Sequence, residues 1–458
     1  HSDTEVILHA WQAWGSGCVQ RLRGMFAFAI WDKKRRHLFL ARDRLGIKPL
    51  YYALLPNGHF LFGSELKALL PHPRLPRARD PLAIEDYFAY GYRPEPRTIY
   101  SDVHTLPPGH TLLIEKGQTT LPRTSQYWDV PFHDNGSASQ AGAERELIER
   151  LREAVDIRLV AEVPLGAFLS GGVDSSAIVA LMAELMDQPV KTCAIGFDVA
   201  AFDETGHARQ VAERYRTDHQ TDTVKADDFE LLDRLGWLYD EPFADSSAMP
   251  TYRVCEAARK RVTVALSGDG GDENLAGYRR YRMHLAEERL RGRLPLALRR
   301  PLFGALGALY PKADWAPRVL RAKTTFQSLA RDSVGAWFHS VSRTTDTQRH
   351  ALFSPAMRND LAGYNAVQVL REHAARAPTD HPLSLVQYLD LKTFLVSILH
   401  KVDRASMAHS LEVRVPLLDH QLVEWMSGLK PEWKLVGGDG KHLFKRALKP
   451  YLPDGIMY

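Results

Sequence analysis

Near the middle of the chain stands the stretch Ala167-Phe168-Leu169-Ser170-Gly171-Gly172-Val173-Asp174-Ser175-Ser176, which leads directly into an apolar run at 177–181. Apolar residues that give way to small residues and then to a helical run are typical of a strand that turns sharply into a helix. The first turn of such a helix has free backbone N–H groups, and these groups and the helix dipole both favour a bound anion. We therefore expect an anion-binding loop at the end of a strand.

The residue types in this loop predict a nucleotide as the anion. Glycines at 171 and 172 let phosphate oxygens approach the backbone. Hydroxyl donors are available from Ser170, Ser175 and Ser176. Asp174 does not suit a phosphate, but it suits the Mg²⁺ that accompanies a nucleotide. The loop lacks the Gly-Lys-Ser/Thr of a Walker motif. Its order instead resembles the pyrophosphate loop of enzymes that split ATP between the α- and β-phosphates. The alternative interpretation is a Gly/Ser turn that caps an ordinary helix.

A second glycine-rich turn follows another predicted strand at 262–266. It reads Ser267-Gly268-Asp269-Gly270-Gly271-Asp272-Glu273. In a doubly wound sheet this turn can face the first loop, which would bring Asp174 and Asp272 to opposite sides of one metal–pyrophosphate unit. Two carboxylates together with phosphate oxygens suit octahedral magnesium. On its own, the second turn would be interpreted as a plain surface loop or a calcium-like turn.

The composition is that of an ordinary globular protein. The chain has 458 residues, of which 45% are hydrophobic and 25% charged, and this length suggests two or three domains. The formal charge is +4, but basic residues are scattered among acidic ones, so we expect no nucleic-acid partner. Three well-separated cysteines favour a reducing compartment and a cytoplasmic location. The sequence predicts neither a membrane span nor a signal peptide.

The two halves of the chain differ in their patterns. Residues 24–115 alternate short apolar runs with turn signals, which predicts antiparallel strands and an α+β domain. A polar stretch at 130–142 marks a linker. Beyond it, predicted strands at 163–169, 191–197 and 262–266 alternate with helical patterns, which favours an α/β doubly wound parallel sheet. From 278 onward the pattern is mostly helical. We thus expect domains at 1–129 and 143–458.

Several segments in order resemble the glutamine-dependent asparagine synthetase family. They lie at 24–32, 41–52, 64–68, the two loops described above, and 411–419. This resemblance implies an α+β, Ntn-type (type 2) glutamine amidotransferase domain in front of an α/β ATP-pyrophosphatase domain with helical additions. It also implies that a carboxylate acceptor, most simply aspartate, attacks ATP to give an acyl-adenylate and pyrophosphate. Ammonia from glutamine then displaces AMP.

The resemblance also assigns roles to particular residues. The ATP-binding set would be Leu169, Ser170, Gly171, Gly172, Asp174, Ser175, Ser176, Ile195, Ser267 and Gly268. Magnesium would be held by Asp174 and Asp272. Lys441 would stabilise charge on the α-phosphate, with Lys445 as the fallback, and Asp269 would serve in acid/base chemistry or in orienting ammonia. Asp3 would hold the α-amino group of glutamine, although an acid in a first helical turn also stabilises the dipole.

The sequence departs from the family pattern in two respects. The family's amidotransferase nucleophile is an N-terminal cysteine, whereas this chain begins with His1, and Cys18 fits a structural position. Both ends look cut from a longer protein. Asn274-Leu275, with the segments at 240–247 and 401–407, resembles a branch linked to exopolysaccharide and exosortase systems. Such a relative would amidate another carboxylate. A non-catalytic nucleotide-binding protein is the remaining alternative, and a homodimer is the candidate assembly.

Overall fold

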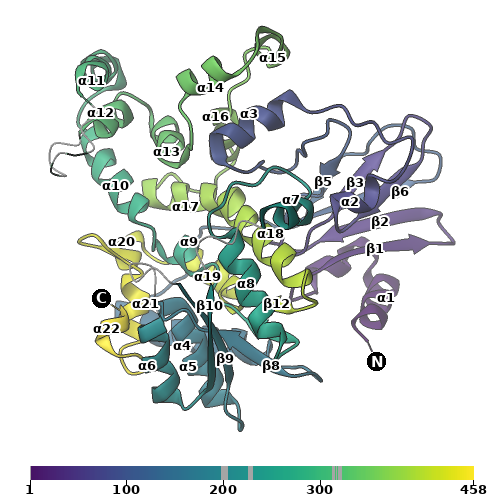
Figure 1. The fold of residues 1–458 in the computed structure, drawn as a ribbon, viewed down its shortest axis with the longest axis vertical. Helices are drawn as coiled ribbons and strands as arrows, with labels where there is room; N and C mark the ends of the chain where they lie inside the picture. Colours follow the sequence, from purple (N-terminus) through teal and green to yellow (C-terminus); the bar gives the residue numbers. More distant parts are fainter. Residues whose placement is uncertain are drawn as a thin grey trace.

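The computed structural model describes residues 2–197, 205–224, 231–311, 315, 317 and 322–457. Short antiparallel strands occupy the N-terminal part, and parallel strands with many helices occupy the rest of the chain (Figure 1). The two parts lie against each other. Figure 1 shows the strands β1 to β6 on one side of the molecule and the parallel sheet at its lower end.

Two antiparallel sheets make up the N-terminal part. The first has the order β1 (Ala27–Asp32), β2 (His37–Arg42), β6 (His110–Glu115), β7 (Ser125–Gln126), and the second β4 (Phe60–Gly63), β3 (Tyr51–Leu54), β5 (His104–Thr105). Three α-helices, α1 (Asp3–Trp14), α2 (Leu66–Leu69) and α3 (Pro81–Tyr90), and the 3-10 helix Gly15–Gln20 accompany them. At the N-terminus of α1 the Ser2 hydroxyl accepts the N–H of Glu5 at 3.3 Å, which caps the helix. The predicted α+β organisation is confirmed.

A five-stranded sheet forms the core of the C-terminal part. Its order is β10 (Asp218–Val224), β9 (Lys191–Phe197), β8 (Leu165–Phe168), β11 (Val264–Leu266), β12 (Glu412–Arg414), and all four neighbouring pairs are parallel. The chain runs outward from β8 to β10 and then returns to place β11 on the other side of β8. The strand order therefore reverses between β8 and β11. Ligands of such sheets bind at the crevice that this reversal opens beyond the carboxyl ends of the strands.

Two groups of helices cover the sheet. The first consists of α4 (Gln140–Asp156), α5 (Val173–Leu185) and α6 (Thr205–Tyr215), and the second of α7 (Leu231–Tyr239), α8 (Ala248–Arg259) and α18 (Phe394–Met407). Helix α5 packs on β8, α8 packs on β9 and β10, and α18 packs on β12. Leu266 in β11 and the side chains of residues 177–181 in α5 are fully buried between these layers. The predicted doubly wound parallel sheet is thus present.

The remaining elements are mostly helices, as predicted from residue 278 onward. They are α9 (Gly271–Leu275), α10 (Arg279–Arg291), α11 (Leu296–Leu309), α12 (Lys323–Leu329), α13 (Ser333–Val341), α14 (Asp346–Leu352), α15 (Pro355–Asp360), α16 (Val367–Ala374), α17 (Pro382–Lys392), α19 (His420–Ser427), α20 (Pro431–Lys434), α21 (His442–Ala447) and α22 (Asp454–Met457), with a 3-10 turn at Pro416–Leu418 and the hairpin β13 (Leu435–Val436) and β14 (Asp439–Gly440). Among the described residues, the stretch 382–407 is long and apolar enough to cross a membrane by length and composition, which differs from the expectation of no such stretch. However, 67% of its apolar window is buried inside the protein, as in a core helix.

Candidate active site

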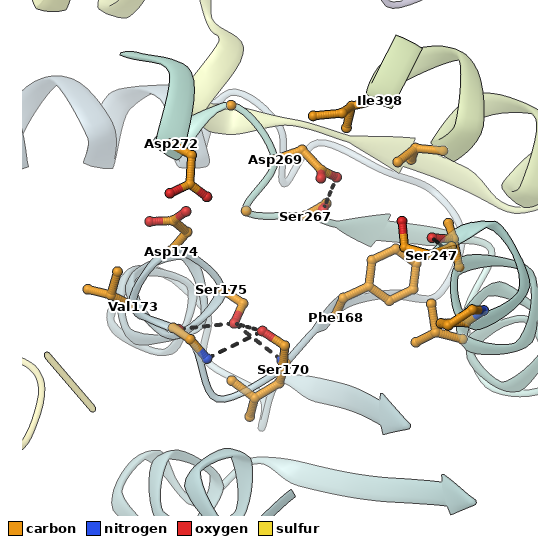
Figure 2. A pocket seen from close by; sticks show the side chains of 18 of the residues that line it. Phe168, Ser170, Val173, Asp174, Ser175, Ser247, Ser267, Asp269, Asp272 and Ile398 are labelled. Atoms are coloured by element: carbon orange, nitrogen blue, oxygen red, sulfur yellow. Dashed lines mark hydrogen bonds between the residues drawn. The ribbon is translucent and has the colours of Figure 1, made fainter. Parts of the chain in front are cut away.

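A cavity of about 500 Å³ lies at the point where the strand order reverses. Its walls are the loop after β8, the turn after β11, the first half of α8, the middle of α18, and Lys441 at the start of α21. Figure 2 shows side chains from the loop after β8, the turn after β11 and α18 converging on one space. The two glycine-rich motifs meet here because β8 and β11 are neighbours, with Ala167 paired to Leu266 at their carboxyl ends.

The loop after β8 holds its shape through Ser175. The Ser175 hydroxyl donates to the Gly172 carbonyl at 3.2 Å and lies 3.0 Å from the Ser170 hydroxyl, and it accepts the Ser170 N–H at 3.2 Å (Figure 2). Gly171 has φ of +87°, a conformation that favours glycine. Within the described part of the chain, no side chain caps α5 at Gly172. The N–H groups of its first turn are therefore oriented for an anion.

Glycines allow the acidic turn to approach this loop. A Cβ atom added to Gly268 would lie 2.7 Å from the Ser175 backbone nitrogen, and one added to Gly271 would lie 2.6 Å from the carboxyl carbon of Asp174. Any larger residue at either position would push the two motifs apart. The glycines thus determine the spacing between Asp174 and the turn that carries Asp272.

Lys441 joins the two predicted metal ligands. Its Nζ donates to Asp174 Oδ2 at 2.6 Å and lies 2.8 Å from Asp272 Oδ1. Figure 2 shows the carboxyl groups of Asp174 and Asp272 turned toward each other across the cavity. Lys441 adopts a left-handed backbone conformation, with φ of +55°, at the N-cap of α21. A residue near the end of the sequence thereby reaches the phosphate loop.

Burial and charge shift the pKa values of this group. Burial raises the pKa of Asp174 to about 6, with attraction to Lys441 opposing the rise and repulsion from Asp272 adding to it. Burial acts to lower the pKa of Lys441, but attraction to Asp174 and Asp272 outweighs it, so that the pKa of Lys441 is raised. Lys441 therefore carries a full positive charge at neutral pH.

The residues at this position fit a divalent cation. Asp174 Oδ1 is buried and has no hydrogen-bond partner among the described residues, so one carboxylate oxygen is left for a further ligand. The Lys441 ammonium already shows that a cation is stable between the two carboxylates. No group of three or more His, Cys, Asp or Glu side chains is arranged to hold a metal within the described ranges. Two carboxylates with substrate phosphates and water are nevertheless a usual donor set for Mg²⁺.

The structure brings together most of the predicted nucleotide-binding residues. Those that line the cavity are Leu169, Ser170, Gly172, Asp174, Ser175, Ile195, Ser267 and Gly268. Gly171 and Ser176 are not among the lining residues. Ser176 is fully buried on α5, and its hydroxyl has no hydrogen-bond partner among the described residues. Asp269 lines the cavity and accepts a hydrogen bond from the Ser267 hydroxyl at 2.6 Å.

Three further sequence candidates lie outside this cavity. Asp3 is exposed in the first turn of α1, where its carboxylate accepts the N–H of Thr4 at 2.8 Å. Cys18 is fully buried in the 3-10 helix after α1, as expected for a structural residue. Lys445 lies one turn beyond Lys441, and its ammonium pairs with Asp439.

Sequence reasoning missed other lining residues. Lys401 on α18 donates to Asp245 at 3.0 Å and to the Ser247 hydroxyl at 2.5 Å, which places a cation and a hydroxyl at the wall of the cavity. Glu273 is almost fully buried and accepts a hydrogen bond from Tyr278 at 2.5 Å, and burial raises the pKa of Glu273 to about 8. Lys401 and Glu273 belong to segments that resemble the family. That resemblance was the signal by which the sequence could have indicated them.

Comparison with known families agrees with this geometry. The model of the asparagine synthase family matches residues 146–458, and that of the glutamine amidotransferase domain matches residues 1–128. The chain belongs to the asparagine synthase family. The glutamine amidotransferase match covers the part of the chain that carries the two antiparallel sheets.

Several curated proteins resemble the chain. A putative asparagine synthetase [glutamine-hydrolyzing] 2 of Methanocaldococcus jannaschii is 42% identical over 285 residues, which are 60% of this chain and 54% of that protein. The asparagine synthetase [glutamine-hydrolyzing] 1 of Bacillus subtilis is 31% identical over all of this chain and 70% of its own length. Amidase chyE of Penicillium rubens is 29% identical over 99% of this chain and 71% of that protein. The chain thus spans between about half and seven tenths of these relatives.

Proposed function

We propose that the protein is an ATP-dependent ligase that converts a carboxylate into an amide with ammonia taken from glutamine. The observation that carries the proposal is the group of Asp174, Lys441 and Asp272 at the end of the anion-binding loop, where the strand order reverses. The asparagine synthase family and the names of the relatives support the same reaction.

In this proposal the nucleotide occupies the cavity of about 500 Å³. Leu169, Ile195, Ser267 and Gly268 would hold the adenosine, and the N–H groups at the start of α5 would hold the phosphates. A magnesium ion held by Asp174 and Asp272 would neutralise charge on the phosphates that leave. These carboxylates and N–H groups are fixed by the fold before ATP binds, which keeps the reorganisation during the reaction small.

Lys441 supplies a charge close to the reacting phosphorus. When its ammonium is released from the two carboxylates, it remains beside the phosphate loop because α21 begins at this residue. The acceptor carboxylate attacks the α-phosphate, and negative charge develops on that group. A lysine that contacts this charge stabilises the transition state more than it stabilises bound ATP. Asp269, on the wall opposite the loop, would orient the incoming ammonia or accept its proton.

The N-terminal part would provide the ammonia. More specifically, we propose that this part is an Ntn-type amidotransferase domain that hydrolyses glutamine. Asp3 would hold the α-amino group of glutamine. Aspartate is the simplest acceptor. Lys401 and Ser247, which line the cavity, are suited to bind the polar groups of aspartate that do not react with ATP. We also propose that the protein forms a homodimer and is located in the cytoplasm.

The test is the pattern of products formed from ATP. We would incubate the protein with ATP, Mg²⁺, glutamine and one of a panel of carboxylates, and follow the reaction by phosphorus NMR. The proposal predicts AMP and pyrophosphate, formed only when an acceptor is present. ADP with orthophosphate as the main products would reject it. If a carboxylate other than aspartate gives the fastest release of pyrophosphate, the proposed ligase reaction stands and that carboxylate takes the place of aspartate as the proposed acceptor.

A further inference from the structure

A second cavity, of about 380 Å³, adjoins the first at Asp272 and Lys441. It shares Val173, Asp272, Tyr278 and Lys441 with the first cavity. Its other walls are the start of α10, with Arg279 and Arg282, and the segment from β13 to Lys445. Figure 1 shows α9, α10 and α21, which carry residues of these walls. We call it the arginine chamber, after Arg279 and Arg282.

Glycines make the wall between the two cavities thin. A Cβ atom on Gly277 would lie 1.9 Å from Asp272 Oδ1 and 2.3 Å from the Cε of Lys441, and one on Gly440 would lie 2.3 Å from the Ala276 carbonyl oxygen. At these two positions any residue larger than glycine would force a shift of the backbone or of the charged side chains. The Lys441 and Asp272 side chains are therefore the barrier between the cavities, and both belong to the site of the chemistry.

Two cations of the chamber have no carboxylate partner among the residues that the structure describes. Asp272 faces Lys441, and Asp439 pairs with Lys445. Arg282 donates to the Gly438 carbonyl at 3.3 Å, and neither Arg279 nor Arg282 forms an ion pair within the described part of the chain. Both stand in the first turn of α10, where the positive end of the helix dipole disfavours them. A mobile anion in the chamber would explain this placement.

The proposed reaction produces such an anion next to the chamber. An oxygen of the acceptor carboxylate forms a bond to the α-phosphorus of ATP. The bond from that phosphorus to the bridging oxygen breaks, and this oxygen leaves with the electron pair as part of pyrophosphate. Adenylate and acceptor remain in the first cavity, and the chamber adjoins that cavity at Asp272 and Lys441. Arg279 and Arg282 are both exposed, which opens the chamber to solvent.

We propose that the arginine chamber binds pyrophosphate after its release from ATP and conducts it to solvent past Lys441 and Asp272. This inference rests on the proposed function, since only cleavage between the α- and β-phosphates yields pyrophosphate. Arginine suits the task because its planar guanidinium binds phosphate oxygens in pairs. Product release by this route leaves the adenylate enclosed for the attack of ammonia.

The experiment compares the double variant Arg279→Gln/Arg282→Gln with the wild type and with Arg289→Gln. Arg289 is an exposed arginine in the last turn of the same helix and does not line the chamber. Binding of magnesium pyrophosphate and of AMP is measured by calorimetry, and inhibition by pyrophosphate is measured in steady-state assays. We expect the double variant to bind pyrophosphate at least about tenfold more weakly, the loss expected for a charge-assisted hydrogen bond. AMP binding should change much less, and Arg289→Gln should match the wild type.

Two results would overturn the chamber. The first is a double variant that binds pyrophosphate as tightly as the wild type, and the second is an equal loss of AMP and pyrophosphate binding, which indicates damage to the shared walls. A third variant, Arg279→Lys/Arg282→Lys, keeps the charge and should recover part of the pyrophosphate affinity. The outcomes separate from those of the proposed function. A wild type that forms ADP rejects the ligase, whereas one that forms pyrophosphate but shows either overturning result rejects only the chamber.

Discussion

Replacing Lys441 with methionine removes the ammonium that contacts both Asp174 and Asp272, at 2.6 and 2.8 Å, and keeps most of the side-chain volume. The proposed mechanism gives this ammonium a role mainly in the transition state, where it stabilises charge on the α-phosphate. Loss of one preorganised donor of this kind typically costs about 3–4 kcal/mol, or roughly a hundredfold to a thousandfold in rate. ATP binding should weaken far less, because the ground state carries less charge at that position.

The variant should remain folded, which makes the rate interpretable. The pKa of Asp174 is about 6. Loss of the lysine removes the attraction that opposes this rise, so at pH 7 the carboxylate takes up a proton at a cost below about 1.4 kcal/mol, the equivalent of one pKa unit. The expected loss of stability is therefore smaller than the expected loss in the activation barrier. Thermal unfolding of the variant, measured alongside the kinetics, checks that the loss of stability is smaller than the increase in the activation barrier.

The assay for Lys441→Met is single-turnover formation of the adenylate with saturating ATP and acceptor. Lys449→Ala serves as the control, because Lys449 is an exposed lysine shortly after α21 and does not line the cavity. We expect the control to retain the wild-type rate. Adenylate formation by Lys441→Met within a few-fold of the wild type would refute the assignment. Lys445, whose ammonium pairs with Asp439, would then be the next candidate.

Three further predictions follow from the same geometry. Asp174→Asn and Asp272→Asn should each abolish adenylate formation while glutamine hydrolysis persists in the complete protein, since the two reactions use separate domains; parallel loss of both activities in a folded variant would contradict this division. Gly271→Ala should impair ATP-dependent activity severely, because the new Cβ would lie 2.6 Å from the Asp174 carboxyl carbon, whereas Gly304→Ala on α11, with nothing within 4 Å, should be neutral or slightly stabilising; equal activities in the two variants would speak against the close approach. Burial lowers the pKa of Lys434 from 10.5 to about 7, so the folded protein binds fewer protons than the unfolded chain between these pH values and stability rises with pH there. Lys434→Met should remove this rise and exceed the wild type by up to a few kcal/mol near pH 7 in denaturant titrations; an unchanged pH slope would show that the lysine is charged in the folded protein.

The sequence predicts those parts of the candidate site in which a motif directly follows a strand and the two strands are neighbours in the sheet. The loop at 167–176 and the turn at 267–273 each follow an apolar strand, and a doubly wound order places such ends side by side. By contrast, β10 and β12 were not predicted. β10 is a polar, half-exposed edge strand of sequence DHQTDTV, and β12 has three residues. Neither offers the continuous apolar run by which buried strands are recognised.

Residues distant along the chain could not be placed in the same way. Lys441 lies 267 positions from Asp174, and the two meet only because the chain folds back after β12. Lys401 and Ser247 look like ordinary helix residues until α8 and α18 come together. Ser176 illustrates a local limit: successive helical residues are about 100° apart around the axis, so that a hydroxyl next to Ser175 turns into the core.

A motif can also serve the fold rather than the chemistry. The segment 411–419 resembles the family, yet its Asp419 is fully buried and accepts hydrogen bonds from Arg23 at 2.9 Å and Arg158 at 3.1 Å. Arg23 belongs to the N-terminal part, so this carboxylate ties the two parts together. Resemblance alone does not distinguish such a residue from one with a chemical role.

The most direct test of the central claim, attack of a carboxylate on the α-phosphate of ATP, is an oxygen-transfer measurement. The protein is incubated with ATP, Mg²⁺, glutamine and an acceptor whose carboxylate carries oxygen-18, with aspartate as the first choice. The masses of AMP and pyrophosphate are then determined. We expect one labelled oxygen in AMP and none in pyrophosphate, because the carboxylate oxygen stays on the α-phosphorus when ammonia displaces AMP. Unlabelled AMP formed together with the amide, or label in orthophosphate beside ADP, would contradict it.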